Sequence, residues 1–181
     1  MPTHRSDGKA VMSMQELLPL QDIQTFCETN GWVFLVKKHF YHRNECEDFS
    51  KYSNIYDITQ LDDLDPQVLL YQADILISDY SACYIDYLLL DRPILFYQYD
   101  IDEYQKKERS LYMPFDKLGI APISYTKGQL MADIIKVCQG GDEYREKRQA
   151  FTPTYFQNSH QENGREKVKK ILDSLILKYT K

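Results

Sequence analysis

The sequence alternates short apolar runs with stretches in which apolar residues recur at helical spacing. The runs Trp32–Val36 and Pro93–Tyr97 contain no charged or amide side chain. A strand without apolar/polar alternation is typical of a parallel sheet that helices cover, so we expect both runs to be buried on both faces. Over residues 19–30 the apolar positions have helical spacing, and Asn30-Gly31 predicts the end of that helix.

The same alternation continues along the chain, with short connections between the elements. We expect further strands over residues 54–58, 73–78 and 120–125. We expect further helices over residues 65–72, 81–90, 127–139, 142–150 and 162–178, and an acidic, tyrosine-rich loop over about 100–115. This order predicts an α/β fold: a doubly wound, mostly parallel Rossmann-like sheet in a single domain, residues 1–181, with a helical tail over 142–181.

The composition restricts the partners of such a domain. The formal net charge is −5 at pH 7, whereas a non-specific nucleic-acid binder needs a basic surface, so we expect no nucleic-acid partner. The N-terminus lacks the apolar core of a signal peptide, and the apolar runs are too short to cross a bilayer. Four cysteines without a C-x-x-C spacing indicate reduced thiols, and therefore a cytoplasmic protein.

Lys37-Lys38-His39 directly follows the first buried strand. Ligands of open parallel sheets lie at the carboxyl ends of the strands. Two cations and an imidazole at such an end suit phosphate binding and proton transfer. The alternative from these residues alone is a solvated basic loop.

A second candidate segment is Ser78-Asp79-Tyr80-Ser81-Ala82, between an expected strand and an expected helix. Small residues let backbone amides approach a ligand, and a helix N-terminus favours an anion. The alternative is local capping, with Ser81 as the N-cap and Asp79 accepting from loop amides. The segment has no glycine, so it is neither a P-loop nor a G-x-G-x-x-G motif.

Two other chemistries fit the residues less well. His39, His42 and Cys46 have a H-x2-H-x3-C spacing, but no fourth ligand is evident, so we predict no metal site and no cofactor. Ser81, His39 and Asp79 could form a hydrolase triad, but the G-x-S-x-G motif is absent.

The helical tail is basic and amphipathic. Its apolar stripe consists of Val168, Ile171, Leu172 and Leu175, beside several lysines. Such a helix could lie on a membrane surface. The alternative is that the stripe docks on the sheet or on a partner domain.

Several segments together carry a resemblance to one family. The central match runs from Ala73 to Ser81 and continues through Ile85-Asp86-Tyr87 and Asp91–Tyr97. The flanking matches are Pro2-Thr3-His4-Arg5, Lys37-Lys38-His39, Tyr99-Asp100 with Tyr104 and Arg109–Tyr112, and Asn163-Gly164. In this order they resemble the CDP-glycerol glycerophosphotransferases, which include the teichoic acid primases and polymerases. Ala82 and Ser110 depart from the family's usual serine and glycine.

This resemblance implies one half of a GT-B fold, in which the active site lies between two Rossmann-type domains. The chain would be the nucleotide-binding half, without most of that half's first strand, which would precede Pro2. Its expected donor is CDP-glycerol or CDP-ribitol, and its acceptor a lipid-linked polymer of the teichoic acid or capsule type, bound through an N-terminal domain absent here. The expected location is the cytoplasm, at the inner face of the cell membrane, with peripheral contact of the full enzyme.

The resemblance also implies roles for individual residues. His39 matches the catalytic histidine near the transferred phosphate, and Lys37 and Lys38 are expected to bind phosphate. Asp79, Ser81 and Ala82 match the pyrophosphate loop, and Arg109 matches an arginine near the diphosphate. Asp86 matches the acidic residue that binds ribose, and the backbone of Ile58 and Thr59 would face the base.

Two other functions stay open at this stage. The spacing from Ser81 to Asp86 is also similar to a motif of UDP-sugar glycosyltransferases and epimerases. Alternatively, the chain is a fragment that binds nucleotide without turning over a substrate, which the missing acceptor domain favours.

Overall fold

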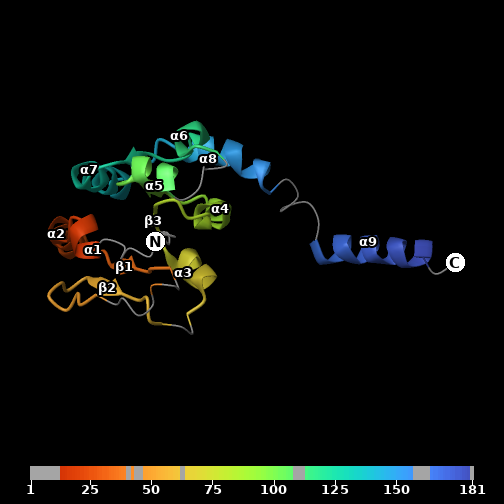
Figure 1. The fold of residues 1–181 in the computed structure, drawn as a ribbon, viewed down its shortest axis with the longest axis horizontal. Helices are drawn as coiled ribbons and strands as arrows, with labels where there is room; N and C mark the ends of the chain where they lie inside the picture. Colours follow the sequence, from red (N-terminus) through yellow and green to blue (C-terminus); the bar gives the residue numbers. More distant parts are fainter. Residues whose placement is uncertain are drawn as a thin grey trace.

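The computed structural model describes residues 13–39, 42, 47–61, 64–107, 113–156 and 164–179 (Figure 1). Within these described residues, five strands form two sheets, and every pairing between neighbouring strands is parallel. One sheet pairs β1 (Phe34–Val36) with β2 (Ile55–Asp57). The other has the order β3 (Leu76–Ser78), β4 (Ile94–Tyr97) and β5 (Ile123–Ser124). The α/β class and the parallel pairing predicted from the sequence are therefore confirmed.

Helices are found in all the segments where the periodicity predicts them, and α1, α5 and α6 are additional helices that were not predicted. The helices before β4 are α1 (Met14–Leu17), α2 (Leu20–Asn30), α3 (Pro66–Gln72), α4 (Cys83–Tyr87) and the 3-10 turn η2 (Leu88–Leu90). The helices after it are α5 (Ile101–Lys107), α6 (Phe115–Leu118), α7 (Lys127–Cys138), α8 (Arg145–Phe151), η3 (Thr152–Thr154) and α9 (Gly164–Tyr179). Gly31 ends α2 at a φ of 70°, as the Asn-Gly stop predicts.

Two apolar clusters hold the sheets and helices together. The first joins α1, α2 and α7 to β1, β2 and β4, with Ile23, Ile55 and Leu130 at its centre. The second packs α4, η2 and α6 on the other face of β4, around Tyr87 and Phe96. All four residues of β4 are buried, as its unbroken apolar run predicts.

Burial of β1 on both faces was a wrong prediction. Val36 is buried, but Leu35 is 50% exposed and Val33, just before the strand, is 57% exposed. Both side chains lie beside a cavity that separates β1 from β3. The apolar run was interpreted as a covered strand, and in this chain the cover is incomplete.

The loop expected over about 100–115 contains a helix, α5. Its first turn holds Asp102 and Glu103 and its last turn Lys106 and Lys107, which suits the helix dipole. Tyr104 is buried on its inner side. The acidic and tyrosine-rich composition was therefore the pattern of a short amphipathic helix.

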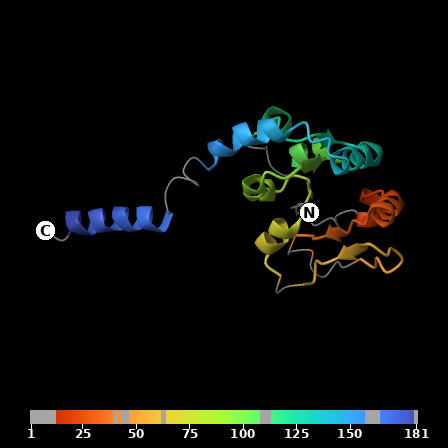
Figure 2. The ribbon, with the colours of Figure 1, turned by 180° about the vertical axis from the view of Figure 1, so that it is seen from behind.

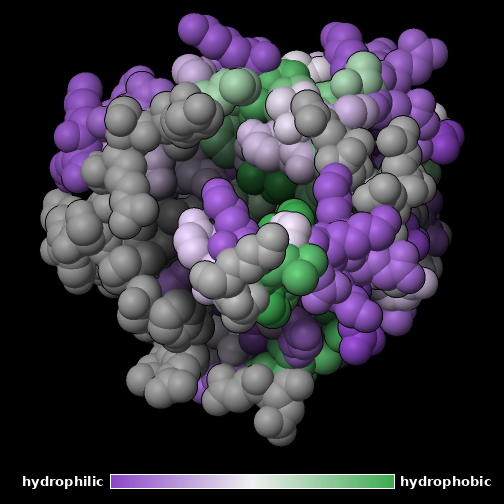
Figure 3. Space-filling view, turned by 90° about the vertical axis from the view of Figure 1, so that its right-hand side faces the viewer, coloured by the Kyte–Doolittle hydropathy of each residue, from purple (hydrophilic) through white to green (hydrophobic). Residues whose placement is uncertain are grey.

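Helix α9 stands apart from the sheets in both ribbon views (Figures 1 and 2). All its described side chains are exposed, including the apolar stripe Val168, Ile171, Leu172 and Leu175. Figure 3 faces the end of the molecule that carries α9 and shows apolar residues at the surface among polar ones. In the structure the stripe therefore does not pack on the sheet, which was one of the alternatives for this helix. Among the described residues, no helix has the length and apolar character needed to span a membrane.

Candidate functional site

The carboxyl ends of β1 and β2 lie side by side at one edge of their sheet, because the strands are parallel and Val36 pairs with Asp57. Lys37 follows one strand and Ile58 the other. The amide of Ile58 donates to the carbonyl of Val36 at 2.9 Å. Two sequence segments predicted to belong to the site are therefore in contact.

The Lys37 ammonium group contacts the backbone of the segment after β2. It donates to the carbonyl oxygens of Ile58, Thr59 and Leu61, each at 3.3 Å. In this arrangement Lys37 fixes the Ile58–Thr59 backbone, the part of the site expected to face a base.

Lys38 is 5% exposed, and its ammonium group forms a 2.7 Å ion pair with Glu47. The same Glu47 carboxylate accepts from the amides of Met14, at 2.7 Å, and Gln15, at 3.3 Å. The Lys38 amide donates to the buried Thr59 hydroxyl at 3.0 Å. Lys38 therefore joins the end of β1 to the start of α1 and to the segment after β2.

Asp57 supports the same corner. Burial by itself raises the pKa of its carboxyl, but hydrogen bonds from Thr59 and from the Glu47 amide, with the positive charge of Lys38, lower it overall. The Asp57 carboxylate accepts from the Thr59 amide at 2.9 Å and from the Glu47 amide at 3.1 Å. Asp57 is thus an anion at neutral pH that orients the two neighbouring loops.

His39 is half-buried beyond the two lysines, and its carbonyl accepts from the His42 amide at 2.8 Å. His39 therefore lies at the carboxyl edge of the sheet, where the sequence predicted it.

In the loop after β3 Asp79 accepts from a loop amide, as the alternative interpretation expected, but the N-cap of α4 is Ala82 and not Ser81. The buried Asp79 carboxylate accepts from the Ser81 amide at 3.3 Å, and the Ser81 hydroxyl accepts from the Cys83 amide at 3.4 Å. Ala82 and Asp86 are exposed. These contacts define the loop shape and leave Ala82 and Asp86 open to solvent.

Tyr80 has a role that the sequence did not reveal. Its ring stacks on that of Tyr104 in α5, with centroids 3.9 Å apart, and its hydroxyl donates to Asp100 at 2.8 Å. The loop after β3 is thereby attached to the segment after β4. The only signal in the sequence was a large aromatic residue in a loop of small residues.

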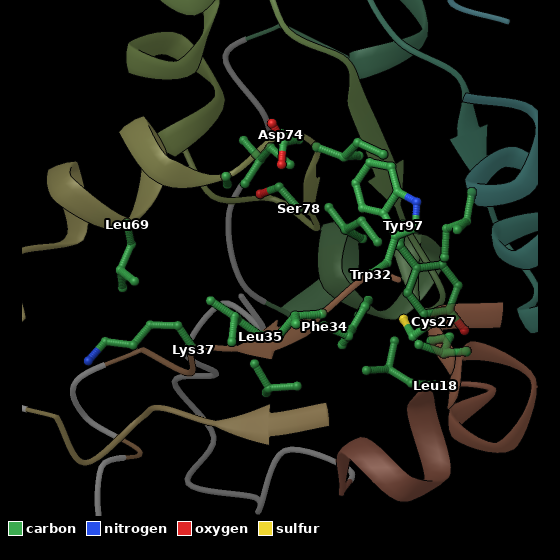
Figure 4. Close-up of a pocket in the computed structure, with 18 of the residues that line it drawn as sticks. Leu18, Cys27, Trp32, Phe34, Leu35, Lys37, Leu69, Asp74, Ser78 and Tyr97 are labelled. Carbon is green, nitrogen blue, oxygen red and sulfur yellow. The ribbon is translucent and has the colours of Figure 1, made fainter. Parts of the chain in front are cut away.

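A cavity of about 510 Å³ runs between β1 and β3 (Figure 4). Aliphatic and aromatic side chains make up most of its wall, and Lys37, Ile58 and Asp79 line it from the carboxyl ends of the strands. The structure thus brings three of the predicted site residues to one cavity. Figure 4 shows the Lys37 side chain extending away from the apolar residues around Cys27 and Tyr97.

Gln98 is a second residue that the sequence analysis missed. It follows β4, is 4% exposed, and lines a separate cavity of about 280 Å³ with Gln105 and Tyr125. Its side-chain nitrogen has no hydrogen-bond acceptor among the residues that the structure describes. A polar residue directly after a wholly apolar strand was the available signal.

The described cysteines, Cys27, Cys83 and Cys138, are free thiols. Burial, with a smaller contribution from Cys27, raises the pKa of the Cys138 thiol to about 11. Burial likewise raises the pKa of Cys27. Both thiols are therefore protonated and unreactive at neutral pH.

Arg109, predicted near the diphosphate, lies outside the described residues, as does Cys46 of the H-x2-H-x3-C spacing. Within the described part of the chain, no group of three or more His, Cys, Asp or Glu side chains could hold a metal ion.

Comparison with known proteins adds to this geometry. The family described as CDP-glycerol:poly(glycerophosphate) glycerophosphotransferase matches residues 1–173. The teichoic acid ribitol-phosphate primase of Bacillus spizizenii is 31% identical over 97% of this chain and 43% of its own length. The teichoic acid glycerol-phosphate transferase of Staphylococcus aureus is 30% identical over 67% of this chain and 30% of its own length. A solved structure of the wall teichoic acid polymerase TagF aligns with a TM-score of 0.63 at 31% identity, over 83% of this chain and 36% of that one.

Fold and site together define a parallel α/β protein whose polar groups converge at the carboxyl edge of its strands. The chain belongs to the CDP-glycerol:poly(glycerophosphate) glycerophosphotransferase family. It spans less than half the length of these two relatives.

Proposed function

We propose that this chain is the donor-binding half of a transferase that moves polyol phosphate from a CDP-activated donor, CDP-glycerol or CDP-ribitol, to a cell-surface polymer. Family membership supports the reaction class. The observation that carries the proposal is the convergence of Lys37, Ile58 and Asp79 from three parallel strand ends on one cavity. Nucleotides bind to open α/β sheets at this edge.

The donor lies across the carboxyl edge and not inside the apolar part of the cavity. A diphosphate loses too much hydration free energy in an apolar slot without paired charges. Its pyrophosphate contacts the loop of Asp79, Ser81 and Ala82, and its ribose contacts the exposed Asp86. The base stacks beside the Ile58–Thr59 backbone, which Lys37 holds in place.

The basic side chains of the site have two different roles, positioning and phosphate contact. Lys38, with its buried ion pair to Glu47, positions the phosphate site, while His39 and Arg109 contact the phosphates. An acceptor hydroxyl attacks the β-phosphorus of the donor, the bond to the bridging oxygen breaks, and CMP leaves. His39 assists the proton transfer, and positioning and charge neutralisation supply most of the acceleration.

The acceptor side of the reaction lies outside this chain. A lipid-linked polymer binds to a second domain, across the cleft from His39, and the full enzyme works in the cytoplasm at the inner face of the membrane. The exposed basic helix α9 is available for a peripheral membrane contact or for that second domain. The 181 residues alone should therefore bind donor without turnover.

The first experiment measures nucleotide preference by titration calorimetry. The chain should bind CDP-glycerol and CDP more tightly than UDP or ADP, because the family is named for a CDP donor. Equal or tighter binding of UDP would favour the glycosyltransferase interpretation and refute the proposal.

A variant pair then tests the diphosphate contact. Arg109→Ala should weaken CDP binding about 10- to 150-fold, since a charge-assisted hydrogen bond is worth roughly 1.5–3 kcal/mol. Arg145→Ala is the control, because Arg145 is exposed on α8 and pairs with Asp91. Unchanged CDP affinity in Arg109→Ala would show that the site is misplaced.

Activity is tested by CMP release from CDP-glycerol with a lipid-linked acceptor. The chain alone should give no measurable release, because the facing domain supplies up to roughly 7–11 kcal/mol of positioning. Adding an acceptor domain from a longer relative should restore release, and His39→Ala should abolish it again while CDP binding remains. Robust release by the chain alone would contradict the division into two halves.

A further inference from the structure

A second cavity lies at the carboxyl edge of the sheet formed by β3, β4 and β5. Its volume is about 280 Å³, and its polar lining consists of Gln98, Gln105, Asp116 and Tyr125. Gln98 directly follows β4 and Tyr125 directly follows β5. Because these strands are parallel neighbours, their carboxyl ends meet at the edge where ligands of open α/β sheets bind. We call this cavity the Gln98 pocket.

Gln98 forms the buried floor of the pocket, since only 4% of it is exposed. Its backbone amide donates to the Ser124 carbonyl at 2.9 Å, which continues the pairing of β4 with β5. Two residues earlier, Phe96 packs edge-on against Phe115 of α6, with ring centroids 4.5 Å apart. Side chains of a strand alternate between its faces, so Gln98 lies on the same face as Phe96, where α6 covers the sheet.

The Gln98 side chain carries a buried donor that lacks a partner. Its nitrogen has no hydrogen-bond acceptor in the part of the chain that the structure describes. An unpaired buried donor destabilises a fold, so nearly all such groups in proteins have a protein, water or ligand partner. We therefore expect the Gln98 amide to donate to a group that enters the pocket.

The other lining residues define the chemistry of that group. The rim holds the exposed side chains of Gln105, Asp116 and Tyr125, and among the described residues no lysine or arginine lines the pocket. A phosphate there would be repelled by the Asp116 carboxylate and would find no cation. Amide, carboxylate and phenol groups instead form hydrogen bonds with hydroxyl groups. The pocket therefore suits a neutral group that carries several hydroxyls.

The pocket adjoins the loop proposed to bind the pyrophosphate. Tyr80 of that loop stacks on Tyr104 of α5, and its ring meets that of Phe115 edge-on, with centroids 6.5 Å apart. Phe115 also lines the Gln98 pocket. The Tyr80 hydroxyl donates to Asp100 at 2.8 Å. The loop and the pocket are thus connected through one pair of aromatic rings.

The arrangement of the strands gives the direction of the donor. The base site proposed at Ile58 and Thr59 follows β2, and the pyrophosphate loop follows β3. Figure 1 shows β1 and β2 on one side of β3, and α5 and α6 on the other. The pyrophosphate joins the nucleoside to the polyol, so the polyol leaves the loop on the side away from the base. That side is the Gln98 pocket.

We propose that the Gln98 pocket binds the polyol of the CDP-activated donor, with the Gln98 side-chain amide donating to one of its hydroxyls. This inference rests on the proposed function and adds to it the residue that recognises the transferred group. Other residues contact the nucleoside and the pyrophosphate, so Gln98 contributes to the affinity for the donor but not for CDP. The terminal polyol of the acceptor has the same hydroxyl chemistry, and the test separates the two sources.

Calorimetry with two ligands isolates the polyol contact. Gln98→Met should weaken CDP-glycerol binding about 2- to 12-fold, the effect of one lost hydrogen bond, and leave CDP affinity unchanged. Gln24→Met is the matched control, because Gln24 is exposed on α2 and donates to Glu28. It should change neither affinity. CDP-ribitol replaces CDP-glycerol in a parallel titration to cover the second polyol.

A second measurement needs no variant, which covers the case in which Gln98→Met does not fold. The side-chain amide of Gln98 gives its own pair of signals in a proton–nitrogen correlation spectrum. These signals should shift when CDP-glycerol is added and stay in place with CDP. Glycerol phosphate, which has the polyol phosphate without the nucleotide, serves as the probe for the end of the acceptor.

Three results would overturn the proposal. The first is an equal effect of Gln98→Met on CDP and CDP-glycerol binding, or an effect on neither, because the partner of Gln98 would then be water or the nucleotide. The second is a Gln98 amide signal that CDP shifts as much as CDP-glycerol. The third is a shift with glycerol phosphate and none with CDP-glycerol, which would assign the pocket to the acceptor.

Failure of this proposal can be told apart from failure of the donor site. If neither CDP nor CDP-glycerol binds to the chain, the donor site itself is refuted. If both bind and Gln98→Met affects them alike, the donor site stands and only the polyol pocket is refuted.

Discussion

The ion pair between Lys38 and Glu47 offers a sharp test of how the candidate site is built. The variant Lys38→Met removes the ammonium group and keeps the length of the side chain. The pair is 2.7 Å long with side chains 5% and 13% exposed, so its loss leaves a carboxylate in a poorly solvated place. Glu47 keeps two amide donors, Met14 and Gln15, which limits the damage.

The expected loss of folding free energy is about 3 kcal/mol, the lower end of the range for removing one partner of a buried pair. For a chain of this size that corresponds to a fall in melting temperature of about 6–12 °C. The assay is thermal and urea unfolding followed by circular dichroism at pH 7.

Lys136→Met is the matched control, since Lys136 pairs with Glu143 at 2.8 Å with both side chains more than half exposed. It should change the melting temperature little, because solvent screens an exposed pair. Lys38→Met combined with Glu47→Gln should cost about 1–2 kcal/mol less than the sum of the single variants. The reasoning is refuted if Lys38→Met and Lys136→Met melt alike, or if Lys38→Met loses CDP affinity with its stability intact.

Two further predictions concern other buried polar groups. The hydrogen bonds of Arg148, which is 1% exposed, lower the pKa of Asp142, so this pair stabilises the fold above pH 4 and the gain is lost as pH falls through the lowered pKa. The stability difference between the parent and Arg148→Met should therefore be largest at neutral pH and shrink below about pH 4 in urea unfolding; a constant difference would contradict the assignment. Gln98→Met removes a buried donor that has no acceptor in the described part of the chain, so it should raise stability by up to about 1 kcal/mol. If the Gln98 amide hydrogen-bonds to the donor substrate, calorimetry should show weaker CDP-glycerol binding in Gln98→Met. Unchanged binding would exclude Gln98 as a donor-binding residue.

The sequence by itself determined the α/β class and most of the longer helices and strands. Helix stops and caps act within a few residues, so Gly31 after α2 and the Thr126–Gln129 capping box of α7 follow from local chemistry. The unbroken apolar run of β4 predicted its burial correctly. The segments that resemble the family, taken in their order along the chain, were enough to identify it, and the family comparison confirms the match over residues 1–173.

Only the tertiary structure decided how the site residues are used. Phosphate binding by Lys37 and Lys38 stays a prediction. The structure adds that their ammonium groups contact backbone carbonyls and Glu47, contacts that depend on how β2 and α1 approach β1. Helix α5 was missed because Tyr104 is buried by stacking on Tyr80, a contact across 24 residues of chain.

The incomplete cover of β1 is the same kind of case. The unbroken apolar run Trp32–Val36 indicates a strand whose two faces are both suited to burial, so the sequence predicted that other elements cover both faces. Whether that cover exists depends on strand pairing between segments far apart in the chain, and side-chain periodicity carries no information about which segment supplies the neighbouring strand. The exposure of Leu35 could therefore be seen only when β1 and β3 were placed on either side of the cavity.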